Sequence, residues 1–520
     1  MTVKRAVASM AIATVVSRIF GFLRIIVVAA VLGTTALGNT FQSTNAMSNV
    51  LFDLLAAGAL SAAIVPQLVH ALEKSEKDIR QLFSSLVSLV LIGLGAVSLL
   101  GVIFASQISE LLFSRAPIET RADQIEAGAL LLRFFMPQIV LYGLGAIAVA
   151  ALIAKKRFIA QVVAPIGGSI FIMIAVTAFY FVHDSTDVSL QTKDIVILGI
   201  AGTGACLAFV SIPIVVAMRN GLSFLPSGDV KRGLGALANS TWAVAIQASA
   251  AILLAMSIFV GNKLAGAVVA YQLAFMLFLA PYAIISQSFS TVLLPDLSKT
   301  ALKEKENEDF GLIVNNMMTW TYRPMVAITG LCFALSVPIT HLVSQGRASG
   351  GQEMVEIAFI SLILGLVPYS IYQAASRVYF AKTNIRLPAV TIVISSTVVA
   401  FVGLIGSSHL CGNKLLLLMG IAHTLAYTFA AGVLLFLLRK DKYDVFPNLT
   451  TWLIALAAAF YGLIGYLISQ SINFEGKFVP VLYIALFTVA NLALVLIVLP
   501  QDKKDWITSR TRTMLKKEKI

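Results

Sequence analysis

Two arginines, Arg18 and Arg24, lie inside the first long apolar stretch of the chain. A guanidinium at the centre of a transmembrane helix costs about 2.5–3.5 kcal/mol to insert, so two in one stretch need a physical reason. On an ideal helix this spacing separates them by about 9 Å along the axis and about 120° around it. Gly21 lies between them, and we expect it to bend or unwind the helix and bring both side chains toward one cavity. Because a guanidinium donates two parallel hydrogen bonds to phosphate, the pair predicts an anion site.

Asp53 is almost the only carboxylate deep inside an apolar stretch. It is a candidate ion-pair partner of Arg18 or Arg24, which would give the arginines a structural role. Snorkelling of the arginines toward the membrane surface is the other structural interpretation. Alternatively, Asp53 is a proton or cation site.

Uncharged residues supply the remaining site candidates. Four intramembrane amides can bind cargo or join helices through hydrogen bonds: Asn49, Gln247, Gln272 and Gln373. Kinks or helix ends are expected at prolines. The predicted structural or gating positions are Gly21, Pro66, Pro137, Pro281, Pro295 and Pro368.

The sequence contains no motif of an enzyme. It has no Walker loop, no GxSxG and no HExxH, and its five histidines share no metal-ligand spacing. We therefore expect neither catalysis, nor a cofactor, nor a bound metal.

The composition indicates an all-α polytopic membrane protein. Hydrophobic residues make up 58% of the 520 residues and charged residues only 12%, with a mean hydropathy of +0.90. Soluble chains have about 25% charged residues. About 20 apolar residues are needed for each crossing. We predict fourteen transmembrane helices at 8–33, 46–69, 82–106, 127–153, 158–181, 195–218, 233–260, 264–297, 321–344, 356–381, 387–408, 415–438, 449–470 and 478–499.

The segments between these helices alternate in basic residues. Those on one side hold 28 of the 38 lysines and arginines, and those on the other side hold seven. The positive-inside rule therefore predicts that both termini are cytoplasmic. The same distribution explains the net charge of +13 without a nucleic-acid partner. We interpret the basic tail as an anchor on anionic lipid headgroups.

Internal similarity predicts two copies of a six-helix unit. Three pairs share an offset of 229 residues: Ser61 with Ser290, Pro66 with Pro295, and Arg157 with Arg386. Parallel repeats of this kind place a substrate site between two lobes. The expected organisation is an N-terminal lobe at 1–220, a C-terminal lobe at 221–445, two additional helices at 446–500 and the basic tail at 501–520.

Six segments resemble the MurJ/MviN lipid II flippases of the multidrug/oligosaccharidyl-lipid/polysaccharide exporter superfamily. They are SRIFGFLR (17–24), SNVLFDLLAAGALSAAIVP (48–66), LLRFFMP (131–137), KRFIAQVVAP (156–165), TVLLPDLSK (291–299) and VYFAKTNIRLP (378–388). The resemblance implies two lobes around a V-shaped cavity. It also implies transport of an undecaprenyl-diphosphate-linked peptidoglycan precursor from the inner to the outer leaflet, with Arg18 and Arg24 holding the diphosphate.

The sequence departs from the family pattern at five positions. Ile25 and Asn39 stand where many members have Asp, Phe52 replaces a common Arg, Ala57 replaces a common Glu, and no arginine lies near Met276. The resemblance implies a bacterial plasma membrane protein with lipid II and membrane lipids as partners. A monomer is expected, and contact with the cell-wall synthesis machinery is an open alternative.

Three function classes compete. The first is a flippase for lipid II or for another polysaccharide-lipid. The second is a multidrug/cation antiporter of the same superfamily, which would need buried carboxylates for cation exchange. The third is a membrane glycosyltransferase or ligase, which would need an acidic or histidine-bearing outer loop, whereas the loops here are short.

Overall fold

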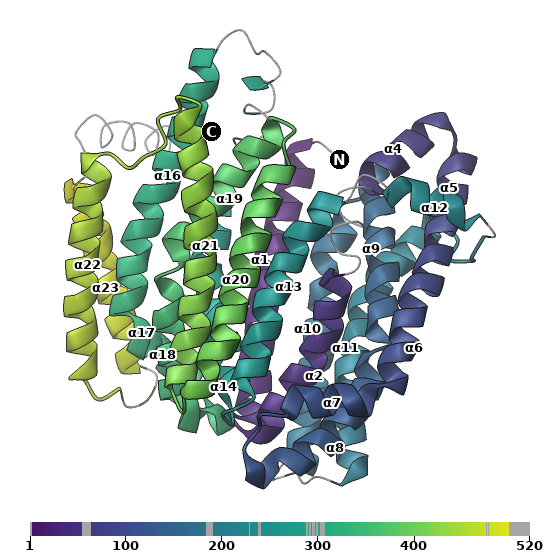
Figure 1. Ribbon diagram of the computed structural model, residues 1–520, viewed down its shortest axis with the longest axis horizontal. Coiled ribbons are helices and arrows are strands. Elements are labelled where there is room, and N and C mark those ends of the chain that lie inside the picture. The colour runs from purple at the N-terminus through teal and green to yellow at the C-terminus, as the bar shows by residue number, and fades with distance from the viewer. Residues whose placement is uncertain are drawn as a thin grey trace. The chain divides into compact units, whose positions relative to one another are not determined.

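The structure is a computed structural model. It describes residues 3–54, 64–183, 191–227, 229–237, 241–287, 307–474, 476 and 478–498, with isolated positions between 290 and 301. Pro295 and the tail at 501–520 lie outside the described residues. Every regular element in the described part is a helix (Figure 1).

The chain forms two compact units. Unit 1 holds the N-terminal helices, η4 (Gly346–Gly351), α20 (Arg386–Gly406) and η5 (Ser407–His409). Its N-terminal elements are α1 (Val3–Leu32), α2 (Ala36–Phe52), α4 (Ile64–Lys74), α5 (Glu76–Leu89), η2 (Val90–Leu94), α6 (Gly95–Ile103), α7 (Ala105–Phe113), α8 (Ile118–Phe135), α9 (Gln138–Ala154), α10 (Ile159–Val182), α11 (Thr192–Arg219), α12 (Val230–Leu237) and α13 (Thr241–Gly261).

Unit 2 contains most of the C-terminal helices. Its elements are η3 (Tyr282–Ser286), α16 (Asn307–Ala334), α17 (Ser336–Val343), α19 (Leu366–Ala381), α22 (Leu449–Gln470) and α23 (Phe478–Val498). Three helices contribute to both units: α14 (Ala267–Pro281), α18 (Gln352–Ile363) and α21 (Lys414–Lys440). The expected lobe boundaries at residues 220 and 445 stay predictions.

The all-helical membrane fold is confirmed, but the count of fourteen crossings is not. In the described part, ten helices are long and apolar enough to cross a membrane, or up to twelve if each of two bent pairs is one span. The predicted second crossing falls on α2 and α4, which flank the undescribed residues 55–63. The last predicted crossing has a shorter apolar described segment, Phe478–Leu492.

Proline positions and helix breaks coincide at three sites. Pro137 lies at the junction of α8 and α9, and α14 ends at Pro281, where the π-helical turn η3 begins. α18 and α19 meet at a bend of 45°, and Pro368 lies in the first turn of α19. Pro66 is also in a first turn, that of α4. Proline is tolerated in a first turn because those N–H groups have no partner within the helix.

The turns that follow α9 and α19 share one conformation. Lys156 and Thr383, which are 227 residues apart, both have φ near +60°. In each turn the next N–H bonds back to the helix, from Arg157 to the Leu152 carbonyl and from Asn384 to the Tyr379 carbonyl. The structure therefore matches Arg157 with Asn384 at this turn, rather than with Arg386 as the offset of 229 predicted.

A glycine-rich turn anchors the C-terminal end of α1. η4 packs against α1, and Arg347 donates hydrogen bonds of 3.4 Å to the carbonyls of Val31 and His183. These carbonyls lie at the ends of α1 and α10, where carbonyls lack partners within the helix and the helix dipole is negative. Gly346 has a φ of +62°, and a Cβ there would lie 2.7 Å from the carbonyl oxygen of Ala30.

Gly346→Ala is expected to lower the free energy of unfolding by about 1–3 kcal/mol, because it combines a left-handed backbone with overpacking. The matched control is Gly21→Ala in α1, where a Cβ would meet nothing within 4 Å. That change is expected to be neutral or stabilising by up to about 1 kcal/mol, since alanine favours helix. Thermal unfolding of the purified protein in detergent measures both, and equal melting temperatures would contradict the anchoring role of this turn.

Candidate functional site

The predicted arginines lie on one unbroken helix. α1 stays α-helical through Gly21, so the expected unwinding there does not occur. The side chains of Arg18 and Arg24 are both exposed. A guanidinium on a membrane helix is stabilised where it reaches water, so this exposure fits a water-filled space better than contact with lipid.

Tyr142 of α9 lies near Arg24 and near residues of two other helices. Asn49 of α2 and Cys206 of α11 lie close to its hydroxyl. Arg24 is near enough to Tyr142 for electrostatic interaction. Of these four residues, the sequence reasoning selected Arg24 and Asn49 and missed Tyr142 and Cys206. A tyrosine within an apolar helix was the available signal, because a buried phenol usually has a hydrogen-bond partner.

A buried polar network supports this group one helical turn away. The Ser48 hydroxyl donates to the Gln138 side-chain oxygen at 3.2 Å, and the Gln138 amide donates to the Thr203 hydroxyl at 3.3 Å. Thr203 in turn donates to the Phe134 carbonyl at 2.7 Å. Gln138 is fully buried. The network therefore fixes α2, α9 and α11 relative to one another.

Asp53 follows α2 and does not neutralise the arginines. Its backbone N–H bonds back to the carbonyls of Asn49 and Val50, and its side chain is half-buried. Among the described residues, Asp53 forms no ion pair with Arg18 or Arg24. No ion pair with a described carboxylate neutralises Arg24, so its charge is available to an anionic ligand.

The other predicted amides lie apart from this group in the described contacts. Gln247 of α13 is exposed and Gln272 of α14 is half-buried, and neither forms a side-chain hydrogen bond with another described residue. Gln373 belongs to unit 2, where it is within hydrogen-bonding range of Tyr369. Their assignment to the substrate site stays a prediction.

A second polar cluster in unit 1 joins α2 to the turn between α13 and α14. The Asn39 amide donates to the Leu264 carbonyl at 2.8 Å, and its oxygen accepts from the Val268 N–H at 3.0 Å. Ser43 donates to the side-chain oxygen of Asn262 at 2.9 Å. Asparagine suits position 39 because it is both donor and acceptor, whereas an aspartate would accept from Val268 but not donate to Leu264.

Two cations extend this cluster toward η5. Arg115 donates to the Ser407 hydroxyl at 2.8 Å and lies over the Phe259 ring, while Lys263 donates to the carbonyls of Ser407 and Leu410. Cations are stabilised at a helix C-terminus because its carbonyls are unpaired and its dipole is negative. These contacts bind the turn between α7 and α8 and the turn after α13 to η5, at the C-terminal end of α20.

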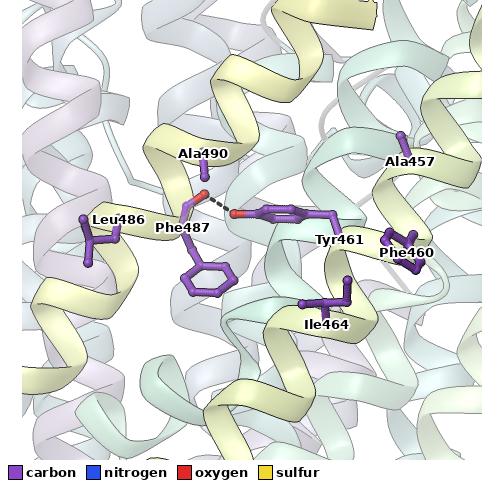
Figure 2. A pocket seen from close by; sticks show the side chains of 7 residues that line it. All are labelled: Ala457, Phe460, Tyr461, Ile464, Leu486, Phe487 and Ala490. Carbon is purple, nitrogen blue, oxygen red and sulfur yellow. Dashed lines mark hydrogen bonds between the residues drawn. The ribbon is translucent and has the colours of Figure 1, made fainter.

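An apolar groove lies between α22 and α23 in unit 2 (Figure 2). Its volume is about 620 Å³, and it is lined by Ala457, Phe460, Tyr461, Ile464, Leu486, Phe487 and Ala490. The one hydroxyl in the lining, that of Tyr461, donates to the carbonyl of Phe487, as Figure 2 shows. With its polar group satisfied in this way, the groove suits an aliphatic chain.

The family model described as "Lipid II flippase MurJ" matches residues 28–488. The chain belongs to the MurJ lipid II flippase family. Among curated MurJ relatives, the lipid II flippase of Burkholderia cenocepacia is 25% identical over 459 residues, covering 84% of this chain and 87% of that protein. The probable lipid II flippase of Rickettsia prowazekii is 24% identical over 394 residues, covering 75% of each chain.

Solved structures show the same fold. A lipid II flippase MurJ in an inward closed conformation gives a TM-score of 0.74 at 22% identity, covering 96% of this chain and all of that one. An inward-facing multidrug resistance MATE transporter of the MOP superfamily gives a TM-score of 0.63 at 13% identity, covering 82% and 94%. The chain is a multi-pass membrane protein, and its fold matches this MurJ structure with a higher TM-score than this MATE structure.

In this MurJ family member, Gln138→Leu is expected to lower the free energy of unfolding by about 1 kcal/mol. The loss is small because Ser48 and Thr203 keep carbonyl acceptors at Asn45 and Phe134. Gln138→Glu is expected to destabilise more, since the described network contains no cation for a buried carboxylate. Thermal unfolding in detergent compares the two variants, and a Glu variant as stable as the Leu variant would contradict a closed, buried network.

Proposed function

We propose that this protein is a lipid II flippase that moves undecaprenyl-diphosphate-linked cargo from the inner to the outer leaflet of the bacterial plasma membrane. The single observation that carries the proposal is the Arg24 site, in which an exposed arginine on a membrane helix has no carboxylate partner among the described residues. Such a group is costly in lipid and suits a dianionic headgroup. Membership of the MurJ family supports lipid II as the cargo.

The proposed mechanism is alternating access between the two predicted lobes, at 1–220 and 221–445. Arg18 and Arg24 would hold the diphosphate, and Asn49 would supply a neutral donor beside them. The cluster of Asn39, Asn262, Arg115 and Lys263 joins N-terminal helices to elements from the second half of the chain. Because these contacts are hydrogen bonds between polar groups, they are suited to breaking and re-forming during a transport cycle.

The groove between α22 and α23 is the proposed site for the polyprenyl chain. Lipid II joins a charged headgroup to a long aliphatic chain, and the groove offers an almost wholly apolar lining. We propose further that both termini are cytoplasmic, as the basic segments predict, and that the protein acts as a monomer without catalytic chemistry.

An antiporter is the weaker alternative. Exchange of cations requires buried carboxylates, and the predicted helices at 233–260, 387–408 and 415–438 contain no Asp or Glu. The MATE neighbours support the shared fold, but their TM-scores are lower than that of the MurJ structure. Another polysaccharide-lipid with the same diphosphate would fit the Arg24 site equally well, so direct transport assays with lipid II decide between these cargoes.

Arg24→Ala is expected to abolish growth rescue in a bacterium depleted of its own lipid II flippase, while membrane insertion is unchanged. Arg24→Lys should restore only part of the activity, because an ammonium lacks the planar fork that binds phosphate bidentately. The unsubstituted chain is the positive control, and its failure to rescue would remove the proposed function. Full rescue by Arg24→Ala would show that Arg24 is not part of the anion site.

Ala490→Trp is expected to reduce lipid II transport at least several-fold, because an indole would fill the groove that the polyprenyl chain enters. The matched control is Ala459→Trp, an exposed position on α22 that does not line the groove. Flipping of lipid II in proteoliposomes measures both variants. Equal rates for the two would place the polyprenyl chain elsewhere.

A further inference from the structure

We propose that the segment 221–227, called the strap here, and the helix α12 form a membrane anchor that binds anionic phospholipid headgroups of the inner leaflet. The strap is the non-helical segment that follows α11, and it leads into α12. Such an anchor is independent of the transported cargo. The leaflet follows from the proposed cytoplasmic location of both termini.

The strap lies along a helix that is long and apolar enough to cross a membrane. This candidate span is Glu76–Ile103, which begins with α5. Ser88 of α5 lies about 18 Å along the helix axis from Glu76. Its hydroxyl accepts a hydrogen bond from the Ser227 N–H at 2.7 Å and donates one to the Ser227 carbonyl at 2.6 Å. Non-helical backbone beside a membrane span needs polar partners of this kind, so the strap is suited to the membrane boundary.

Buried contacts hold the rest of the strap on unit 1. The Phe224 ring packs edge-on against that of Phe83 in α5, with their centroids 5.0 Å apart. Leu222 is buried in the apolar core that contains Phe83. Leu225, in contrast, is 72% exposed. One side of the strap is therefore packed on protein, and the other side presents a large apolar side chain outward.

The helix α12 is two-sided in the same way. Toward α5, beside which Figure 1 shows it, the Arg232 guanidinium donates to the carboxylate of Asp78 at 3.0 Å and to the side-chain oxygen of Gln81 at 2.9 Å. On the open side, Lys231 is exposed and Leu234, one turn later, is 53% exposed. A leucine and a lysine on the open face of an amphipathic helix are typical of a segment that lies in the membrane interface.

The charges around the strap favour an anionic partner. The carboxylates of Asp78 and Glu76 form ion pairs with Arg232 and Lys155. Asp229 accepts a hydrogen bond from the Arg232 N–H at the start of α12. Three exposed cations border the strap and α12 without taking part in these ion pairs: Arg80, Arg219 and Lys231. Because the inner leaflet is negatively charged and attracts cations beside a membrane span, its headgroups fit this surface.

Fluorescence quenching tests whether the strap reaches lipid. Leu225→Cys is labelled with bimane in a Cys411→Ser background, because Cys411 is exposed whereas Cys206 and Cys332 are buried. In proteoliposomes that contain phosphatidylglycerol, we expect brominated phospholipid to quench the label and aqueous iodide to have little effect. The matched control is Lys77→Cys, an exposed position in the first turn of α5, where iodide should quench instead.

Lys231→Gln tests the contact with headgroups. We expect the phosphatidylglycerol concentration that gives half of the thermal stabilisation in detergent to rise about fivefold, the loss expected for one cation near a membrane surface. Lys231→Arg should behave like the unsubstituted protein, because it keeps the charge. Phosphatidylcholine, which has no net charge, should not distinguish the three proteins.

The outcomes are distinct, and none of these measurements requires lipid II. Lipid quenching at Leu225→Cys together with the weaker phosphatidylglycerol effect in Lys231→Gln supports the anchor. Iodide quenching as strong as that of Lys77→Cys overturns it, because the strap would lie in water. Protection from both quenchers also overturns it, in favour of a contact with a second copy of the chain. An unchanged phosphatidylglycerol effect in Lys231→Gln overturns the contact with anionic headgroups.

Discussion

The proposed site depends on one constraint, a guanidinium that must stay charged on a membrane-spanning helix. Arg24 is exposed and has no carboxylate partner among the described residues, since Asp53 forms no ion pair with it. An arginine in that position is stable only where water or an anion reaches it. Tyr142 of α9, which interacts with it electrostatically, is an uncharged phenol at neutral pH. The charge of the guanidinium therefore remains available to an anionic ligand.

Unit 1 combines buried contacts that fix its helices with polar contacts that can break and re-form. The Ser48, Gln138 and Thr203 network and the apolar packing around it fix α2, α9 and α11. The Asn39 and Ser407 contacts instead link N-terminal helices to elements from later in the chain through separate hydrogen bonds. A carrier needs both kinds of contact, because its binding site must keep its geometry while access to that site alternates.

Much of the fold and of the Arg24 site was predictable from the sequence, and the predictions that failed did so for physical reasons. Long apolar runs predict helices because lipid leaves no other way to satisfy the backbone, and Arg18 and Arg24 stand out by their insertion cost. Tyr142 and Cys206 were missed because a lone tyrosine or cysteine in an apolar helix is ordinary core composition. Gly21 was expected to bend or unwind α1, but the helical backbone hydrogen bonds persist through this glycine because nothing competes for them. The helix breaks at Pro137 and Pro281 were predictable because proline has no N–H to donate. The left-handed turns at Lys156 and Thr383 were not, because no glycine at these positions indicates them.

The most direct test of the central claim is the response of lipid II flipping to membrane potential in sodium-free proteoliposomes. A site in which no carboxylate neutralises Arg24 carries net negative charge outward with its cargo or returns positive charge inward. An inside-negative potential favours both by about 2.3 kcal/mol per charge per 100 mV. We predict that a potassium-diffusion potential accelerates flipping without sodium when the side from which lipid II is moved is negative. A rate that is unchanged when the potential is collapsed, or that requires sodium, would contradict it.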